Sequence, residues 1–199
     1  MPRSVASLLT AFALLALAAP PALARSDLFR ALKGGGYVLV MRHAHSPAEP
    51  PAAGKGDPAN KAGERQLDRE GEAQARSVGH AIRVLRIPIG PVYSSPTFRA
   101  LQTAQLMGLA RIETRAELGD GGASMAVSAA GQAGTAWLKA AAGETPPPGK
   151  DVLIITHGPN IVLAFGGGLK EMADGEAAVF RPEGRNRFAL VGRIKPEAW

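Results

Sequence analysis

Hydrophobic positions along the chain follow two different periods. Continuous apolar runs at 37–41 and 152–155 are typical of strands that are covered on both faces of a sheet. The segment 67–86 instead places its apolar residues three and four positions apart, which marks an amphipathic helix. Its apolar stripe consists of Ala75, Val78, Ile82 and Leu85. The two periods together indicate buried strands with helices packed on them.

The same patterns predict further elements in alternation. The other expected helices cover 27–33, 95–107, 125–142 and 159–165. The other expected strands cover 90–94, 110–113 and the C-terminal segments "EAAVFRP" and "RFALVGRI". Ser95 and Pro96 are expected to begin their helix as its N-cap and first-turn proline. Strands separated by helices predict an α/β protein, a three-layer α/β/α sandwich around a mostly parallel sheet.

The N-terminal residues have the pattern of a secretory signal peptide. Arg3 gives a positive start, a largely apolar stretch covers 5–19, and Ala22-Leu23-Ala24 has the small-x-small form of a cleavage site. A membrane anchor is the alternative, but these 15 residues fall short of the roughly 20 that a spanning helix needs. We therefore expect a signal peptide at 1–24 and a mature domain at 25–199. That domain would be periplasmic or secreted and would keep no stable membrane anchor.

Composition narrows the chemistry further. The chain has no cysteine, which excludes thiol nucleophiles, thiolate metal sites and a lipid-modified cysteine. Its net charge is +6, or +5 without Arg3, but there is no dense run of Lys and Arg, and aromatic residues make up only 5%. We therefore expect no nucleic-acid partner. A moderately basic surface fits an anionic small substrate instead.

Side chains that can bind phosphate follow three of the predicted strands. Arg42 and His43 come after the first strand. Arg99 lies one turn into the helix after the second strand, and His157 comes after 152–155. Each of these residues alone has an ordinary structural interpretation. Because ligand sites lie at the carboxyl ends of parallel strands, their joint placement predicts an electropositive pocket whose arginine forks suit phosphate.

The remaining two histidines are less informative. His43 and His45 have the spacing of a two-histidine metal pair, yet the chain has only four histidines and such a hydrolase needs further ligands. We therefore expect no metal and no cofactor, with His45 lining the pocket as a substrate-binding residue. His80 lies in the middle of a predicted helix and is expected at the surface.

Several motifs together resemble the histidine phosphatase superfamily, which contains phosphoglycerate mutases, acid phosphatases and small phosphohistidine phosphatases. "VLVMRHAHS" is similar to that family's strand ending in Arg-His-Gly or Arg-His-Ala. "LDREGEAQARSVG" resembles its "L-T-x-x-G-x-x-Q-A" helix start, and "IITHG" its second histidine strand. The most specific block is "VYSSPTFRALQTAQ", close to the family's "S-S-x-x-x-R-A-x-Q-T-A". Order and spacing agree from about 37 to 164, and the resemblance implies a phosphoglycerate mutase-like fold.

The resemblance implies a two-step phosphoryl transfer that hydrolyses a phosphate monoester. His43 would attack phosphorus and become a phosphohistidine, which water then hydrolyses. Arg42, Arg99 and His157 would hold the phosphate oxygens and stabilise the developing charge. The residue chemistry agrees independently, because a neutral imidazole is a good nucleophile near pH 7.

The family also uses an acidic residue to protonate the leaving oxygen. Gly158 follows the second histidine, where the acid-phosphatase branch has an aspartate. The other branch places a carboxylate near a "leucine-x-glutamate" pattern, and "ELGDGG" matches this in outline, which favours Asp120. The competing carboxylates are Glu117, Glu171 and Glu176, each of which has a solvated surface position as its ordinary interpretation.

Two other functions remain open from the sequence. A non-catalytic protein that binds phosphate or a phosphosugar could use the same fold, although binding alone needs no nucleophile. A mutase is also possible on family grounds, but an exported protein would not meet cytoplasmic glycolytic intermediates. The expected substrate is a phosphorylated small molecule or an envelope sugar. The loop 44–65 and the segment 119–134 are expected to decide which one.

Overall fold

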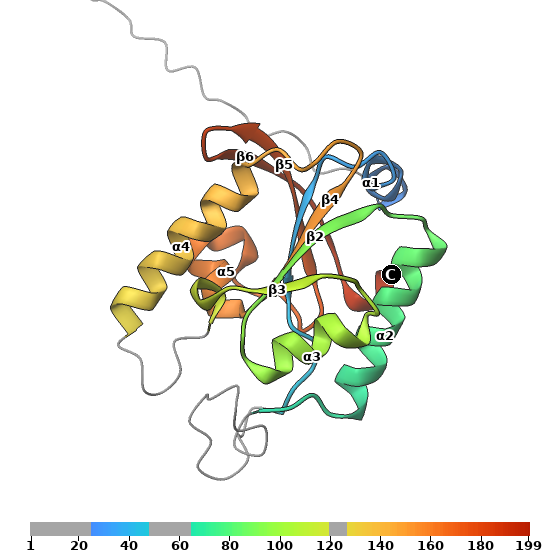
Figure 1. The fold of residues 1–199 in the computed structure, drawn as a ribbon, viewed down its shortest axis with the longest axis horizontal. Helices are drawn as coiled ribbons and strands as arrows, with labels where there is room; N and C mark the ends of the chain where they lie inside the picture. Colours follow the sequence, from blue (N-terminus) through green and yellow to red (C-terminus); the bar gives the residue numbers. More distant parts are fainter. Residues whose placement is uncertain (1–24, 48–64, 120–126) are drawn as a thin grey trace, which may run out of the picture.

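The computed structural model describes residues 25–47, 65–119 and 127–199. Within them the chain forms one six-stranded sheet in the order β3-β2-β4-β1-β5-β6 (Figure 1). The strands are β1 (Val38–Arg42), β2 (Ile89–Ser94), β3 (Ile112–Thr114), β4 (Asp151–Thr156), β5 (Ala177–Gly184) and β6 (Arg187–Ile194). The expected signal peptide at 1–24 and the candidate acid Asp120 lie outside the described residues, so both stay predictions.

Four neighbouring strands of the sheet are parallel. β1 pairs in parallel with β4, so that Val38 lies opposite Val152 and Arg42 lies opposite Thr156. β2 is parallel to both β4 and β3. The C-terminal hairpin of β5 and β6 adds two antiparallel strands beside β1. The sheet is therefore mostly parallel, as the sequence predicts.

Helices cover both faces of the sheet and complete the predicted three-layer sandwich. α1 (Arg25–Leu32), α2 (Arg69–Val84) and α3 (Phe98–Leu106) pack on one face. α4 (Val127–Gly143) and α5 (Gly158–Phe165) pack on the other, on the left in Figure 1. Successive residues of β1 alternate between the two cores, with Leu39 facing the first and Val40 the second. Burial on both faces explains why this strand is a continuous apolar run.

Short connections complete the described chain. Three 3₁₀ turns are η1 (Ala116–Leu118), η2 (Gly167–Leu169) and η3 (Pro196–Ala198). In the part of the chain that the structure describes, no helix combines the length and apolar character that crossing a membrane requires.

α2 lies directly on the chain that leaves β1. Its predicted apolar stripe is buried at Ala75, Val78 and Ile82, and His80 is exposed as expected. A Cβ atom on Gly71 would lie 2.0 Å from the carbonyl oxygen of His45, a distance that real side chains do not adopt. Only glycine therefore allows α2 to pack against the backbone just beyond β1, where the candidate site begins.

The helix after β2 begins later than predicted. Its first residue is Phe98 and its N-cap is Thr97, so the expected N-cap at Ser95 and first-turn proline at Pro96 are wrong. The physical reason lies in the Ser95 hydroxyl. Its oxygen accepts a hydrogen bond from the Thr97 N–H at 3.2 Å and also bonds to the ring of His157.

Asp151 is a buried carboxyl group at the opposite end of the sheet from the candidate site. Its side chain is fully buried at the start of β4, and its Oδ1 accepts a hydrogen bond from the Tyr37 N–H at 2.9 Å. Its other carboxyl oxygen is buried and has no hydrogen-bond partner among the described residues. Burial therefore raises the pKa of Asp151 to about 7, because the charged form cannot be solvated.

This raised pKa makes the stability of the fold depend on pH. Folding favours the protonated form, so the contribution of Asp151 is complete below pH about 4 and is lost as pH rises through about 7. We predict that Asp151→Asn, which removes the charge, raises Tm relative to the natural chain by more at pH 8 than at pH 5. The two pH units between 5 and the pKa of about 7 correspond to roughly 2.7 kcal/mol, so this Tm difference should grow by about 8 °C between the two pH values. A Tm difference that stays the same from pH 5 to pH 8 would contradict the assignment.

Candidate active site

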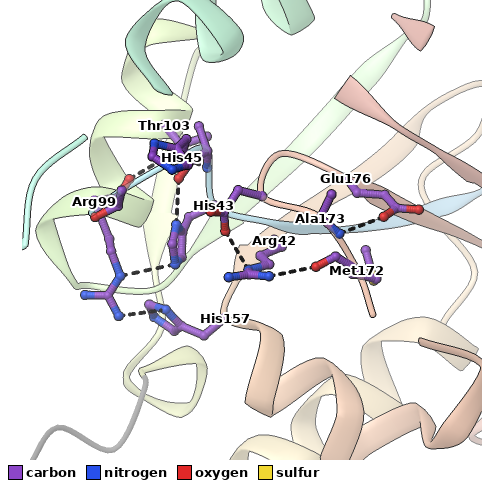
Figure 2. Close-up of polar contacts among 12 residues, drawn as sticks. Arg42, His43, His45, Arg99, Thr103, His157, Met172, Ala173 and Glu176 are labelled. Carbon is purple, nitrogen blue, oxygen red and sulfur yellow. Dashed lines mark hydrogen bonds and ion pairs between the residues drawn. The ribbon is translucent and has the colours of Figure 1, made fainter. Parts of the chain in front are cut away.

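The four predicted phosphate-binding residues come together at the carboxyl end of the parallel strands. The His43 N–H donates to the Thr156 carbonyl at 2.9 Å, which continues the β1–β4 ladder and places His43 beside His157. The Ser95 N–H donates to the Ile155 carbonyl at 2.9 Å, which fixes the chain beyond β2 at the same edge. Figure 2 shows His43 between Arg99 and Arg42, with His157 completing the group. The predicted convergence of strand ends is confirmed.

Arg99 joins the two histidines. It lies near the start of α3 and is 5% exposed. Its Nε donates to Nε2 of His43 at 3.2 Å, and its Nη2 lies 3.0 Å from Nδ1 of His157. Because a guanidinium group can only donate, both of these ring nitrogens must be acceptors. One buried cation therefore faces the lone pairs of two imidazoles (Figure 2).

His43 is held in a single tautomer with a low pKa. Its Nδ1 lies 2.8 Å from the Ala44 carbonyl oxygen, which can only accept, so Nδ1 carries the proton and Nε2 is unprotonated. The pKa of His43 is lowered to about 3, first by burial and then by the charges of Arg99 and Arg42, against the opposing effect of the bond to Ala44. The ring is therefore neutral at neutral pH, with a nucleophilic nitrogen turned toward the arginine.

His157 is oriented by the serine that fails to cap α3. Its Nε2 lies 2.9 Å from Ser95 Oγ and 3.3 Å from Thr97 Oγ1, both buried hydroxyls. Since Nδ1 accepts from Arg99, Nε2 carries the proton and donates to the Ser95 oxygen. The "SSPT" sequence thus serves to fix an imidazole rather than to begin a helix.

Arg42 is held from the side by the chain before β5. Its Nη1 donates to the Met172 carbonyl at 2.7 Å, as Figure 2 shows. Its Nε lies 2.7 Å from Oδ1 of Asp174 in an ion pair whose angles do not meet hydrogen-bond geometry. A Cβ atom on Gly158 would lie 3.5 Å from Arg42 Nε, so the guanidinium packs closely over the start of α5. Asp174 is a residue of this site that the sequence analysis does not identify.

Part of the chain matches a known protein family. Residues 38–123 match the family model described as histidine phosphatase superfamily (branch 1). The matched range includes β1 with the adjoining His43, and the helix that bears Arg99. This part of the chain therefore carries the sequence pattern of the histidine phosphatase superfamily. A search among curated proteins finds no significant match.

Solved structures of other proteins share this fold. A protein histidine phosphatase SixA complexed with tungstate is 21% identical, with a TM-score of 0.59 over 80% of this chain and 97% of that chain. A phosphoserine phosphatase mutant from Entamoeba histolytica in complex with phosphoserine is 14% identical, with a TM-score of 0.55 over 81% of this chain and 98% of that chain. At these identities the likeness establishes the fold, and it spans nearly the whole length of the two solved structures.

His45 is directed by an acidic partner on α2. Its Nδ1 lies 2.9 Å from Oδ2 of Asp68, and its backbone N–H donates to Oε1 of Gln74 at 3.0 Å. The hydrogen bond with Asp68 raises the pKa of His45. The role of His45 in substrate binding stays a prediction.

The arrangement gives no support to a metal pair at His43 and His45. The two rings face different partners, Arg99 for His43 and Asp68 for His45. Residues 25–47, 65–119 and 127–199 contain no group of three or more His, Asp or Glu side chains placed to hold a metal ion. The expectation that this site works without metal stays a prediction.

The candidate general acids differ in position. Asp120 is outside the described residues, but the chain leading to it is fixed near β4. Asn160 of α5 donates to the carbonyls of Leu118 at 3.1 Å and Gly119 at 2.7 Å, and Thr156 also donates to Leu118. The segment that leads to residue 120 is therefore anchored beside β4, the strand that His157 follows.

The competing glutamates lie in three different environments. Glu171 is exposed and Glu117 is half-buried. Glu176 is 1% exposed and pairs with Arg193, with 2.7 Å between Oε1 and Nε. The expectation of a surface carboxylate is therefore wrong for Glu176. Its carboxylate turns away from His43 (Figure 2) and also accepts from the Ala173 N–H at 2.8 Å. The Glu176 carboxylate therefore stabilises the chain segment just before β5.

Proposed function

We propose that this protein is a member of the histidine phosphatase superfamily, and a phosphatase that hydrolyses a phosphate monoester through a phosphohistidine on His43. The observation that carries the proposal is the unprotonated Nε2 of His43, which faces the point where Arg99, Arg42 and His157 converge. The match to the superfamily model and the phosphatase names of the solved structures support the same chemistry.

The first step transfers the phosphoryl group to the enzyme. Nε2 of His43 forms a bond to phosphorus as the ester P–O bond breaks, and a general acid protonates the leaving oxygen. The donors of Arg99 that now face the two imidazoles would turn to the phosphate oxygens, together with Arg42 and His157. Two guanidinium cations, the buried Arg99 and the partly exposed Arg42, stabilise the charge that spreads over those oxygens.

The second step returns His43 to its starting state. Water attacks phosphorus while the general acid, deprotonated in the first step, takes a proton from it; the P–N bond breaks, and inorganic phosphate leaves. The Ala44 carbonyl keeps the Nδ1 proton in place throughout, because the 2.8 Å contact joins atoms of adjacent residues on a fixed strand end. His43 therefore leaves as a neutral imidazole and needs no further proton transfer before the next turnover.

A protein that only binds phosphate is the alternative function. It would need Arg42, Arg99 and His157 but no unprotonated ring nitrogen turned into the pocket. The tautomer of His43, fixed by Ala44 and Arg99, favours the enzyme.

The proposed substrate is a phosphorylated small molecule. One similar structure is named as a complex with tungstate, an oxyanion, and the other as a complex with phosphoserine, a phosphate monoester. The signal-like N terminus supports an exported protein, periplasmic or secreted, and therefore an envelope-sugar phosphate as one substrate. Asp120 is the proposed general acid.

The nucleophile is tested by two matched histidine variants. We predict that His43→Asn lowers kcat on a phosphate ester by roughly 10⁴-fold or more, because no covalent intermediate can form. His80→Asn, at an exposed histidine, should change kcat less than about twofold. Acid-quenching assays with labelled substrate should find phosphate on the natural chain that is labile in acid and stable in base. Full activity in folded His43→Asn, verified by its Tm, would rule out this mechanism.

The general acid is tested by changing the leaving group. Nitrophenolate departs readily without a proton, whereas a sugar alkoxide does not. We predict that Asp120→Asn lowers turnover of alkyl phosphates by roughly 10² more than turnover of nitrophenyl phosphate. Glu171→Gln is the control and should show no such dependence. Equal losses on both substrates in Asp120→Asn would remove Asp120 from this role.

The proposed export is tested by the mature N terminus. The protein recovered by osmotic shock or from the medium should begin at Arg25, because cleavage is expected after Ala24. Protein that retains Met1 and stays in the cytoplasmic fraction would contradict export, with no consequence for the phosphatase chemistry.

A further inference from the structure

We infer that Asp174 is a positioning residue, whose carboxylate fixes the Arg42 guanidinium so that its Nη2 edge is presented to the phosphate. The inference rests on the proposed function, in which Arg42 binds a phosphate oxygen. It assigns a role to a carboxylate that follows no strand end and belongs to no sequence motif.

The contacts of Arg42 divide its guanidinium into a held side and a presented side. Asp174 lies 2.7 Å from Nε, and the Met172 carbonyl accepts from Nη1 at 2.7 Å. Nη2 has no protein hydrogen-bond partner among the described residues. The donors that remain for a ligand therefore lie on one edge of a guanidinium that two contacts hold in place.

The backbone before β5 is itself built to present Asp174. The Gly175 N–H donates to the His43 carbonyl at 2.9 Å, and the Arg42 N–H donates to the Glu176 carbonyl at 3.0 Å. Backbone hydrogen bonds of the two residues that follow Asp174 thus hold it next to Arg42 and His43, the proposed phosphate ligand and nucleophile. A Cβ atom on Gly175 would lie 2.5 Å from Oε1 of Gln74, so α2 closes the other side of this segment.

An ion pair between a buried carboxylate and an exposed arginine also holds the segment. Glu176 binds Arg193 of β6 at 2.7 Å, and Arg193 also donates to the Gly168 and Glu171 carbonyls at 3.1 Å. These contacts fix the segment on both sides of Asp174. The carboxylate is consequently a rigid anchor, and an arginine oriented in advance loses less side-chain freedom when it binds an oxyanion.

The orientation of Arg42 matters most in the transition state. A misplaced group can cost about 10²-fold in rate, because the spreading charge needs donors at fixed positions. The Asp174 charge also partly neutralises Arg42, so removal of the carboxylate strengthens the positive field and offsets the lost orientation in ground-state binding. The expected signature is a loss in kcat with little change in KM.

The test compares Asp174→Ala with Asp174→Asn. The alanine variant removes every contact to Arg42 Nε and should lower kcat about 10- to 10²-fold with KM changed less than about threefold. The asparagine variant keeps an oxygen beside Nε but loses the charge, and it should recover part of that loss. Glu183→Gln, at an exposed carboxylate on β5, should leave both constants unchanged. In an Arg42→Lys background, which lacks Nε, Asp174→Ala should have little further effect.

Two kinetic results would overturn the inference. Independent, multiplicative losses from Asp174→Ala and Arg42→Lys would show that Asp174 does not act through Arg42. A loss confined to alkyl phosphates and equal in Asp174→Asn and Asp174→Ala would show that Asp174 is instead the proton donor.

A spectroscopic measurement keeps the inference testable without activity. The Arg42 Nε–H resonance of the ¹⁵N-labelled protein should be protected from exchange, should persist when tungstate is added, and should be lost in Asp174→Ala. Its persistence in Asp174→Ala would overturn the role of Asp174. If the natural chain turns over no ester, the proposed function fails, while this resonance still decides whether Asp174 holds Arg42.

Discussion

The site depends on one buried guanidinium placed between two imidazoles. Arg99 donates to Nε2 of His43 and faces Nδ1 of His157, and these contacts determine where the proton lies on each ring. A cation in this position also makes protonation of His43 unfavourable, in addition to the larger effect of burial on its pKa. The same residue thus keeps the nucleophile neutral and supplies positive charge for an incoming phosphate. Arg99 thus acts together with the Ala44 carbonyl on His43, and together with the Ser95 hydroxyl on His157, to set the tautomer of each ring.

Different protein groups hold the two arginines, which fits different roles in binding an oxyanion. Arg99 is bonded to the catalytic rings themselves, so binding of an oxyanion must rearrange its hydrogen bonds. Arg42 is held by Asp174 and Met172, so its orientation can survive substrate binding unchanged. One arginine therefore responds to the substrate and the other provides a fixed reference. Both arrangements depend on the parallel β1–β4 pairing, which brings His43 to Thr156 and hence to His157.

Residues at strand ends could be predicted from the sequence because parallel strands share one carboxyl edge. That rule locates Arg42, His43, Arg99 and His157, and the apolar runs and helical stripes give the three-layer sandwich. The local sequence at Ser95 is typical of a helix cap, but the ring of His157, distant in the sequence, competes for its hydroxyl. Asp174 could not be found in this way. It reaches Arg42 only because β5 pairs antiparallel with β1, and no local pattern specifies that partner. The hairpin pairing of β5 with β6 places the buried Glu176 against Arg193, a partner that the isolated charge of Glu176 in the sequence does not reveal.

The central claim is that Nε2 of His43 attacks phosphorus while Nδ1 stays bonded to the Ala44 carbonyl. The most direct measurement is NMR of the phosphorylated protein labelled with ¹⁵N in its histidines. The account predicts a one-bond coupling between ³¹P and Nε2 of His43, with the Nδ1 proton still present. Phosphorus coupled to Nδ1 of His43, or to a nitrogen of His157, would contradict it.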